Sequence, residues 1–286
     1  MRHLFSACRQ TAASVRCAFP RFTLALWPRL RTRKRWRRAF RRAAVPVRVV
    51  IVVIAALTLS LGINWAYQLV RKPSELFFPV SVSLYKTPAE TWARYAPLFR
   101  QYSTASITPD LLAALAQVEA SGNPVVRTYW RWAFDSHPFS IYRPASSAVG
   151  MYQITDGTFA EARHYCVRDH VVVQEGAWND RHACRFNGLY SRVIPAHAVE
   201  LTAAELTLQV GRILKQHHLE GGSLAHRRTL ATVIHLCGAG TGDLYASREF
   251  KLLEGQRCGD HRVADYVSKV NIMRLTFDRL AAEQGD

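Results

Sequence analysis

The feature that most restricts the fold is an uncharged apolar segment near the N-terminus. Residues 49–70 are 22 consecutive uncharged residues, mostly Val, Ile, Leu and Ala. At the rise of an α-helix they reach about 33 Å, which is enough to cross the hydrocarbon core of a bilayer. We therefore expect a transmembrane helix here. A cleaved signal peptide is the alternative, since Ser60 and Gly62 could precede a cleavage site, but the preceding region is longer than a signal peptide usually has.

The positive charge of the chain is concentrated before this segment. The net charge is +17, and residues 1–48 contain fourteen Arg or Lys but no Asp or Glu. The positive-inside rule places this region in the cytoplasm, with Trp65 and Tyr67 as interfacial residues at the far end of the helix. We expect no nucleic-acid partner, because the basic block belongs to no recognisable binding fold. The expected location is the inner membrane, as a single-pass protein with its C-terminal domain in the periplasm.

Residues 107–124 predict a buried helix that carries one carboxylate in its last turn. Thr108 can cap the helix, and Pro109 suits its first position. Leucines and alanines recur at helical spacing and place Glu119 on the same apolar face. Gly122 suits the left-handed backbone conformation that commonly ends a helix. Burial and the negative end of the helix dipole both favour the protonated carboxyl group that a general acid needs. A lone glutamate at a helix end more often pairs with an arginine, so its neighbours in the sequence decide the interpretation.

Those neighbours resemble the soluble lytic transglycosylase family. QVEASGNP (117–124) matches the family's Glu, Ser and Asn-Pro, and SSAVGMYQIT (146–155) resembles its later Gly-Leu-Met-Gln-Ile. ADYVSKV (264–270) resembles the closing Tyr-Val-x-Lys-Val helix. The resemblance covers about residues 105 to 275 and implies a mainly α, lysozyme-like fold with Glu119 as the catalytic residue.

The resemblance also implies a glycan-binding cleft. Gln153 can donate and accept hydrogen bonds at once, which suits an N-acetyl group. In the aromatic and arginine-rich residues 125–147, rings could stack on sugars and arginines could bind stem carboxylates, although most such rings fill protein cores. The family's Ala-Tyr-Asn-Ala-Gly is replaced by IHLCGAG (234–240), where we assign no role to His235 or Cys237. The expected substrate-binding residues are Ser121, Tyr142, Arg143, Tyr152, Gln153 and Tyr266.

Four cysteines follow the apolar segment, an even number that favours disulfides in an oxidising compartment. Of three possible connectivities we expect the sequential one, Cys166 with Cys184 and Cys237 with Cys258. Zinc is the alternative, because HYC (164–166) and HAC (182–184) supply two histidines and two cysteines. A spacing of two residues between ligands suits zinc poorly, so we expect no metal and no cofactor.

We expect four regions along the chain: a basic tail (1–48), the transmembrane helix (49–70), a stalk with a packing helix (71–104) and the catalytic domain (105–286). We trust no helical periodicity in the tail and find no convincing strand alternation after the apolar segment. Capping boxes predict helix starts at 87–90, 158–161 and 202–205, and Thr155 also marks the start of the second of these helices. The box at 158–161 would explain Glu161 as a cap residue.

The expected function is cleavage of the peptidoglycan bond between N-acetylmuramic acid and N-acetylglucosamine, with 1,6-anhydromuramic ends as products. Two alternatives stay open: a lysozyme-type hydrolase and a non-catalytic peptidoglycan-binding scaffold protein, the latter because of the altered segment 234–240. A hydrolase needs a second carboxylate. Asp135 and Asp156 are the nearest in sequence, and neither stands at a catalytic position of the family.

Overall fold

The computed structural model describes residues 30–77, 80–133, 141–177, 179–180 and 183–285, which are mainly helical. The chain divides into two units, residues 1–59 and 60–286. The first contains α1 (Leu30–Arg42) and most of α2 (Val45–Arg71). The helix α1 lies in the basic tail and was not expected from periodicity; arginine and lysine are good helix formers, which explains it.

The predicted transmembrane segment lies within α2. This helix is long and apolar enough to cross a membrane, and no residue of its most apolar 18-residue stretch is buried inside the protein. Side chains such as Ile54 and Leu57 are more than half exposed. A core helix of a soluble protein would bury such side chains, so the exposure favours contact with lipid.

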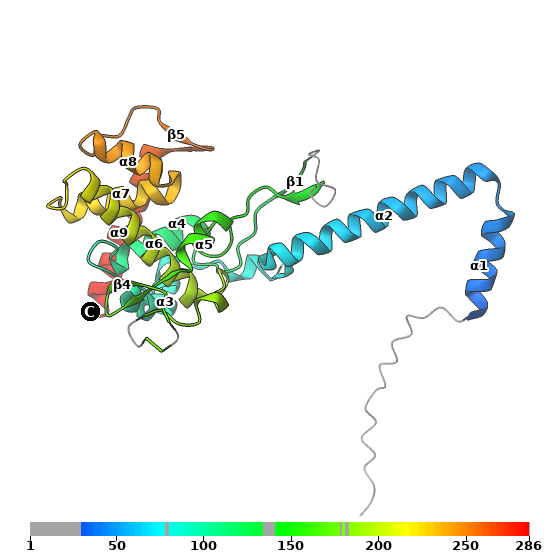
Figure 1. Cartoon of the computed structure of the whole chain (residues 1–286), viewed down its shortest axis with the longest axis horizontal. Helices are drawn as coiled ribbons and strands as arrows, with labels where there is room; N and C mark the ends of the chain where they lie inside the picture. The colour runs from blue at the N-terminus through cyan, green and yellow to red at the C-terminus, as the bar shows by residue number, and fades with distance from the viewer. Residues whose placement is uncertain (1–29, 78–79, 134–140, 178, 181–182, 286) are drawn as a thin grey trace, which may run out of the picture. The chain divides into compact units, whose positions relative to one another are not determined.

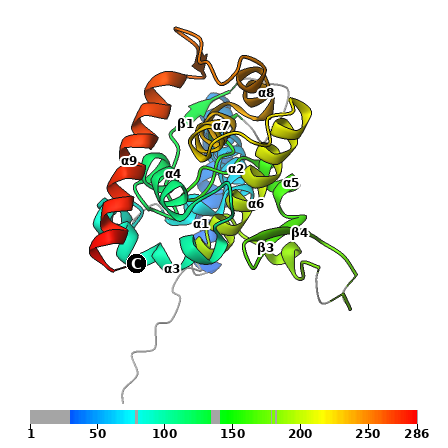
Figure 2. The same cartoon turned by 90° about the vertical axis from the view of Figure 1, so that its left-hand side faces the viewer.

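The second unit is built around α4 (Pro109–Ala120), which packs against α3 (Pro88–Tyr102) and α9 (Val263–Glu283) (Figures 1 and 2). The long helix α6 (Pro195–Gln216) contacts α7 (Leu224–Cys237), α8 (Ala239–Ser247) and the short α5 (Asp156–Ala162). Residues 110–117 of α4 are all buried. This helix is therefore the centre of the core, as the sequence predicts.

Both ends of α4 are fixed by specific contacts. Asp110 in its first turn is buried and lies 3.3 Å from Arg228 of α7 and 3.1 Å from Arg274 of α9. At the other end Ser121 (φ 48°) and Gly122 (φ 65°) both adopt left-handed conformations. A Cβ atom on Gly122 would lie 2.3 Å from the Thr91 hydroxyl oxygen, so only glycine fits there. These contacts fix the direction in which the last turn of α4 presents its side chains.

Three antiparallel hairpins join the helices: β1 (Trp130–Trp132) with β2 (Tyr142–Pro144), β3 (Tyr165–Arg168) with β4 (Val171–Gln174), and β5 (Arg257–Cys258) with β6 (His261–Arg262). The expectation that no strand follows the apolar segment is therefore wrong. Strands of two to four residues are too short to produce a recognisable alternation of polar and apolar side chains.

Residues 71–104 are not a separate stalk, because they belong to the second unit and pack against other parts of it. Short 3₁₀ helices lie at Pro73–Phe77 and Val82–Leu84. The buried Glu75 accepts hydrogen bonds from Arg127 at 3.0 Å and from the indole of Trp130 at 2.9 Å. The side-chain amide of Asn123 donates to the carbonyl oxygen of Ser81 at 2.6 Å. The segment after α2 is thus held directly against the end of α4.

The two disulfides form as predicted, between Cys166 and Cys184 and between Cys237 and Cys258. The first joins β3 to the chain after β4, and the second joins the end of α7 to β5. Cys166 and Cys184 are therefore not available as zinc ligands, and His182 lies outside the described residues.

The predicted capping box is confirmed at Thr87 and Glu90, where side-chain and backbone groups bond reciprocally. The start at Thr155 is also confirmed, because its side chain caps α5. The boxes at 158–161 and 202–205 are wrong, because they lie inside α5 and inside α6, which already begins at Pro195. The pattern of Thr followed by Glu three residues later also occurs inside helices, where it caps nothing. Glu161 and Glu205 consequently need another explanation.

Candidate functional site

Glu119 lies in the last turn of α4 and receives contacts from two other helices. The hydroxyl group of Tyr266, on α9, donates a hydrogen bond to Glu119 Oε1. The imidazole Nε2 of His235, on α7, lies 3.7 Å from the same oxygen. The Glu119 side chain is 19% exposed, so it is mostly shielded but can be reached from outside.

Neither of these neighbours is positively charged at neutral pH. Burial lowers the pKa of His235 below its ordinary value of 6.5, although the nearby Glu119 carboxylate partly opposes this effect. Burial, together with the charge and hydrogen bond of Glu119, raises the pKa of Tyr266 well above its ordinary value. Within the described part of the chain, no arginine or lysine forms an ion pair with Glu119. The simple interpretation of Glu119 as an arginine partner at a helix end is therefore not supported.

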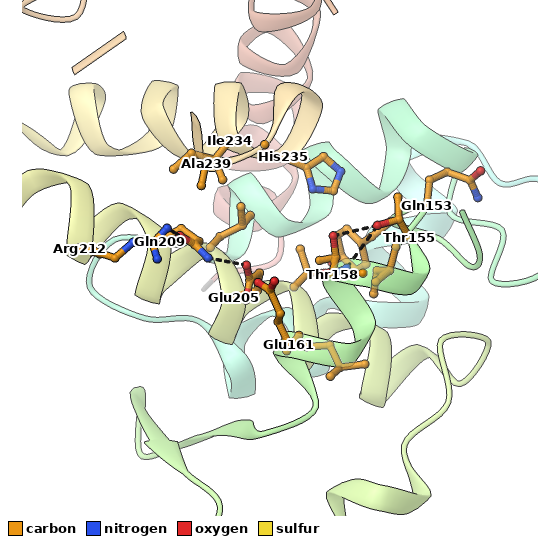
Figure 3. A pocket seen from close by; sticks show the side chains of 18 residues that line it. Gln153, Thr155, Thr158, Glu161, Glu205, Gln209, Arg212, Ile234, His235 and Ala239 are labelled. Atoms are coloured by element: carbon orange, nitrogen blue, oxygen red, sulfur yellow. Dashed lines mark hydrogen bonds between the residues drawn. The ribbon is translucent and has the colours of Figure 1, made fainter. Parts of the chain in front are cut away.

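Glu119 and its neighbour His235 line two different cavities. The first, which we call the α6–α7 cavity, has a volume of about 530 Å³ and is lined by Gln153, Glu161, Glu205 and His235 among others (Figure 3). The second, the α9 cavity, has a volume of about 470 Å³ and is lined by Glu119, Gln153 and Tyr266 among others. Gln153 belongs to both, and His235 of the first lies next to Glu119 of the second. Glu119 therefore lines one ligand-sized cavity, and its neighbour His235 lines the other.

The turn that carries Gln153 is held in an unusual backbone conformation. Gln153 has a φ of 49°, and its side-chain amide donates to the carbonyl oxygen of Gly150 at 2.8 Å. Gly150 has a φ of 81°, and a Cβ atom there would lie 2.0 Å from the carbonyl oxygen of Arg192. The glycine thus lets this turn approach the chain before α6 closely, which places Gln153 at the wall shared by the cavities.

Of the other expected substrate-binding residues, only Tyr152 lines one of these two cavities. Ser121 lines neither cavity; it forms the left-handed end of α4. Tyr152 does line the α6–α7 cavity, but its side chain is fully buried and its hydroxyl donates to the carbonyl oxygen of Leu112 at 3.1 Å, which leaves it a packing role in the cavity wall. Tyr142 and Arg143 line neither cavity beside Glu119, because they lie in strand β2. The structure thus brings Gln153 and Tyr266, but not Ser121, Tyr142 and Arg143, to the cavities beside Glu119.

Two acidic residues of the α6–α7 cavity were not expected from the sequence. Glu161 and Glu205 both point into it, and the side-chain amide of Gln209 donates to Glu205 at 2.8 Å (Figure 3). Burial raises the pKa of Glu205, and the charge of Glu161 adds to this effect, whereas Gln209 and Arg212 oppose it. Glu205 and Gln209 are four residues apart, so the sequence does indicate that they share one face of a helix. It does not indicate that this face lines a cavity.

The described residues include no group of three or more His, Cys, Asp or Glu side chains placed to hold a metal ion. The Asp156 carboxylate, one of the two considered from the sequence as a second carboxylate, is bound by Arg71 at 3.3 Å and Arg192 at 2.8 Å. Asp135 lies outside the described residues. Comparisons with models of protein families, with curated proteins and with solved structures find no match to this chain.

Proposed function

We propose that this protein is a membrane-anchored peptidoglycan lytic transglycosylase with a lysozyme-like domain. The observation that carries the proposal is the placement of Glu119 in the wall of the α9 cavity, with the Tyr266 hydroxyl as its hydrogen-bond donor and His235 of the α6–α7 cavity 3.7 Å away. The resemblance of residues 117–124, 146–155 and 264–270 to the soluble lytic transglycosylase motifs supports it independently. The substrate would be the glycan strands of peptidoglycan.

In the proposed mechanism Glu119 acts twice. As a carboxylic acid it first protonates the glycosidic oxygen between N-acetylmuramic acid and N-acetylglucosamine while the bond from C1 to that oxygen breaks. As a carboxylate it then accepts the proton of the muramic acid 6-hydroxyl while O6 bonds to C1. No water is consumed, and Glu119 ends protonated again. The Tyr266 hydroxyl stabilises the intermediate carboxylate by a charge-assisted hydrogen bond.

Replacing Tyr266 by Phe should test this hydrogen bond. A hydrogen bond to a charged group contributes about 1.5–3 kcal/mol, so we expect kcat to fall by about tenfold or more while KM changes little. The matched control is Tyr245→Phe, since Tyr245 is also buried but belongs to α8 and lines neither cavity. Equal losses in both variants would point to a general packing defect instead.

A lysozyme-type hydrolase is the second candidate, because Glu161 and Glu205 line the cavity next to Glu119. In a hydrolase one of them would activate water or stabilise the glycosyl cation. The products decide between the two candidates, because a hydrolase leaves reducing muramic acid ends.

Zymography with the full-length chain tests the enzymatic function itself. Gels cast with cell-wall peptidoglycan should show a cleared band at the position of the protein. Binding of peptidoglycan without clearing would instead identify a non-catalytic scaffold protein.

The proposed location is the inner membrane of a Gram-negative cell, with the arginine-rich tail in the cytoplasm and the second unit in the periplasm. The charge difference across the apolar segment supports this orientation. We predict that alkaline phosphatase fused after Asp286 is active, whereas a reporter that works only in the cytoplasm is inactive there. The opposite pattern would mean that the chain is inserted the other way or stays inside the cell.

A further inference from the structure

The β1–β2 hairpin has two chemically different faces. Trp130, Trp132 and Tyr142 share one face, with the Tyr142 ring centroid 5.1 Å and 4.8 Å from those of the two tryptophans. Trp132 is nevertheless 57% exposed. On the other face Arg131 and Arg143 are paired directly across the strands. The pairing concentrates positive charge on this face of the hairpin.

This hairpin is attached to the last turns of α2. The side-chain amide of Asn64 donates to the carbonyl oxygen of Tyr142 at 2.6 Å, and Asn64 is almost fully buried. Asn64 precedes Val70, the end of the apolar segment, by six residues, or about 9 Å along a helix. Strand β2 therefore lies at the level of the last two turns of that segment. The pairing of β1 with β2 provides hydrogen-bond partners for backbone N–H and C=O groups of the two strands, as proximity to lipid requires.

A basic pocket lies between the end of α2 and the arginine face of the hairpin. Its volume is about 210 Å³, and its charged lining residues are Arg71, Lys72, Arg131, Arg143 and Asp156. The single carboxylate is bound by Arg71 within the pocket and by Arg192. Lys72 lies 3.7 Å from the buried Glu75, and the lining itself contains four basic side chains and one carboxylate. A pocket with this charge suits an anion that can accept several hydrogen bonds.

We propose that the hairpin docks on the outer leaflet of the membrane and that the basic pocket binds the phosphate of an anionic phospholipid head group. Tryptophan and tyrosine favour the interface between lipid and water, and arginine binds phosphate through paired donors. The inference rests on the membrane span of α2 in the proposed function, but not on glycan cleavage. Docking would hold the second unit against the bilayer at a second point, in addition to its attachment through α2.

Native mass spectrometry of the full-length chain in detergent with added phosphatidylglycerol tests the pocket. We expect bound lipid on the original chain and an affinity lower by about tenfold or more in Arg131→Gln/Arg143→Gln, because two charged donors to phosphate are lost. The control is Arg94→Gln/Arg279→Gln, which removes the same charge from exposed positions on α3 and α9. Equal losses in both double variants, or no loss in the first, would overturn the proposal. Inorganic phosphate that displaces the lipid at equal concentration would also overturn it.

A depth measurement tests the aromatic face. A nitroxide label at Trp132→Cys, in a chain carrying Cys8→Ser and Cys17→Ser, would be examined in vesicles of phosphatidylethanolamine and phosphatidylglycerol. We expect the label to be more accessible to oxygen than to a water-soluble nickel complex, as interfacial positions are. Full exposure to the nickel complex would contradict docking. Zymography on the same samples measures glycan cleavage separately. A label exposed to the nickel complex in a protein that still clears peptidoglycan would contradict docking but not the enzymatic function.

Discussion

Glu119→Gln should abolish nearly all glycan cleavage while leaving the fold intact. General acid catalysis contributes about 10²–10⁴-fold to a rate, and in the proposed mechanism the same group is also the base, so the loss should reach at least the upper part of this range. Glutamine has nearly the same shape and can still accept the Tyr266 hydrogen bond through its carbonyl oxygen. The measurement is the rate of release of soluble fragments from purified sacculi.

The matched control for this variant is Glu220→Gln, since Glu220 is exposed and lines neither cavity beside Glu119. It should retain full activity. Circular dichroism and retention of both disulfides would establish that Glu119→Gln is folded. A folded Glu119→Gln variant with more than about a tenth of the original rate would show that another residue is the general acid.

Loss of the Cys237–Cys258 disulfide should have the second largest effect. The two cysteines are 21 residues apart, and a closed loop of this size stabilises a fold by about 3 kcal/mol in the chain-entropy model. The bond also joins α7, which carries His235, to β5, whose Arg257 lines the α9 cavity. We therefore expect Cys237→Ala/Cys258→Ala to lose about 3 kcal/mol of stability and, well below its melting temperature, most of its activity.

The other disulfide provides the control. Cys166 and Cys184 are 18 residues apart, so their removal should cost a similar free energy of unfolding. Neither cysteine lines a cavity beside Glu119. Cys166→Ala/Cys184→Ala should therefore retain activity at temperatures where it is folded. Denaturant unfolding and the sacculus assay, run on both variants, separate stability from site geometry, and equal activities in both would contradict the assigned role of the Cys237–Cys258 bond.

The sequence predicts those parts of the structure that depend on local patterns. The apolar run predicts α2, and Pro109 with its helical spacing of leucines predicts α4 as the central helix. The chemistry of two similar cysteine spacings predicts both disulfides. In each case the controlling interactions lie within about 20 residues, and so the pattern can be read without knowledge of the tertiary structure.

The parts that could not be predicted depend on distant segments. His235 contacts Glu119 only because α7 packs near α4, and no local pattern specifies that distance. Tyr142 and Arg143 have the composition of sugar-binding residues, yet the bond from Asn64 to Tyr142 spans 78 positions of the chain. Glu161 and Glu205 match the capping pattern locally, but the tertiary structure turns both toward one cavity.

The most direct test of the central claim is the mass of the muramic acid ends released from sacculi by the purified full-length protein. If Glu119 acts alone as acid and then base, the ends are 1,6-anhydromuramic acid, formed without water. Reducing muramic acid ends, heavier by one water, would contradict this account and assign one of the neighbouring carboxylates, Glu161 or Glu205, to hydrolysis.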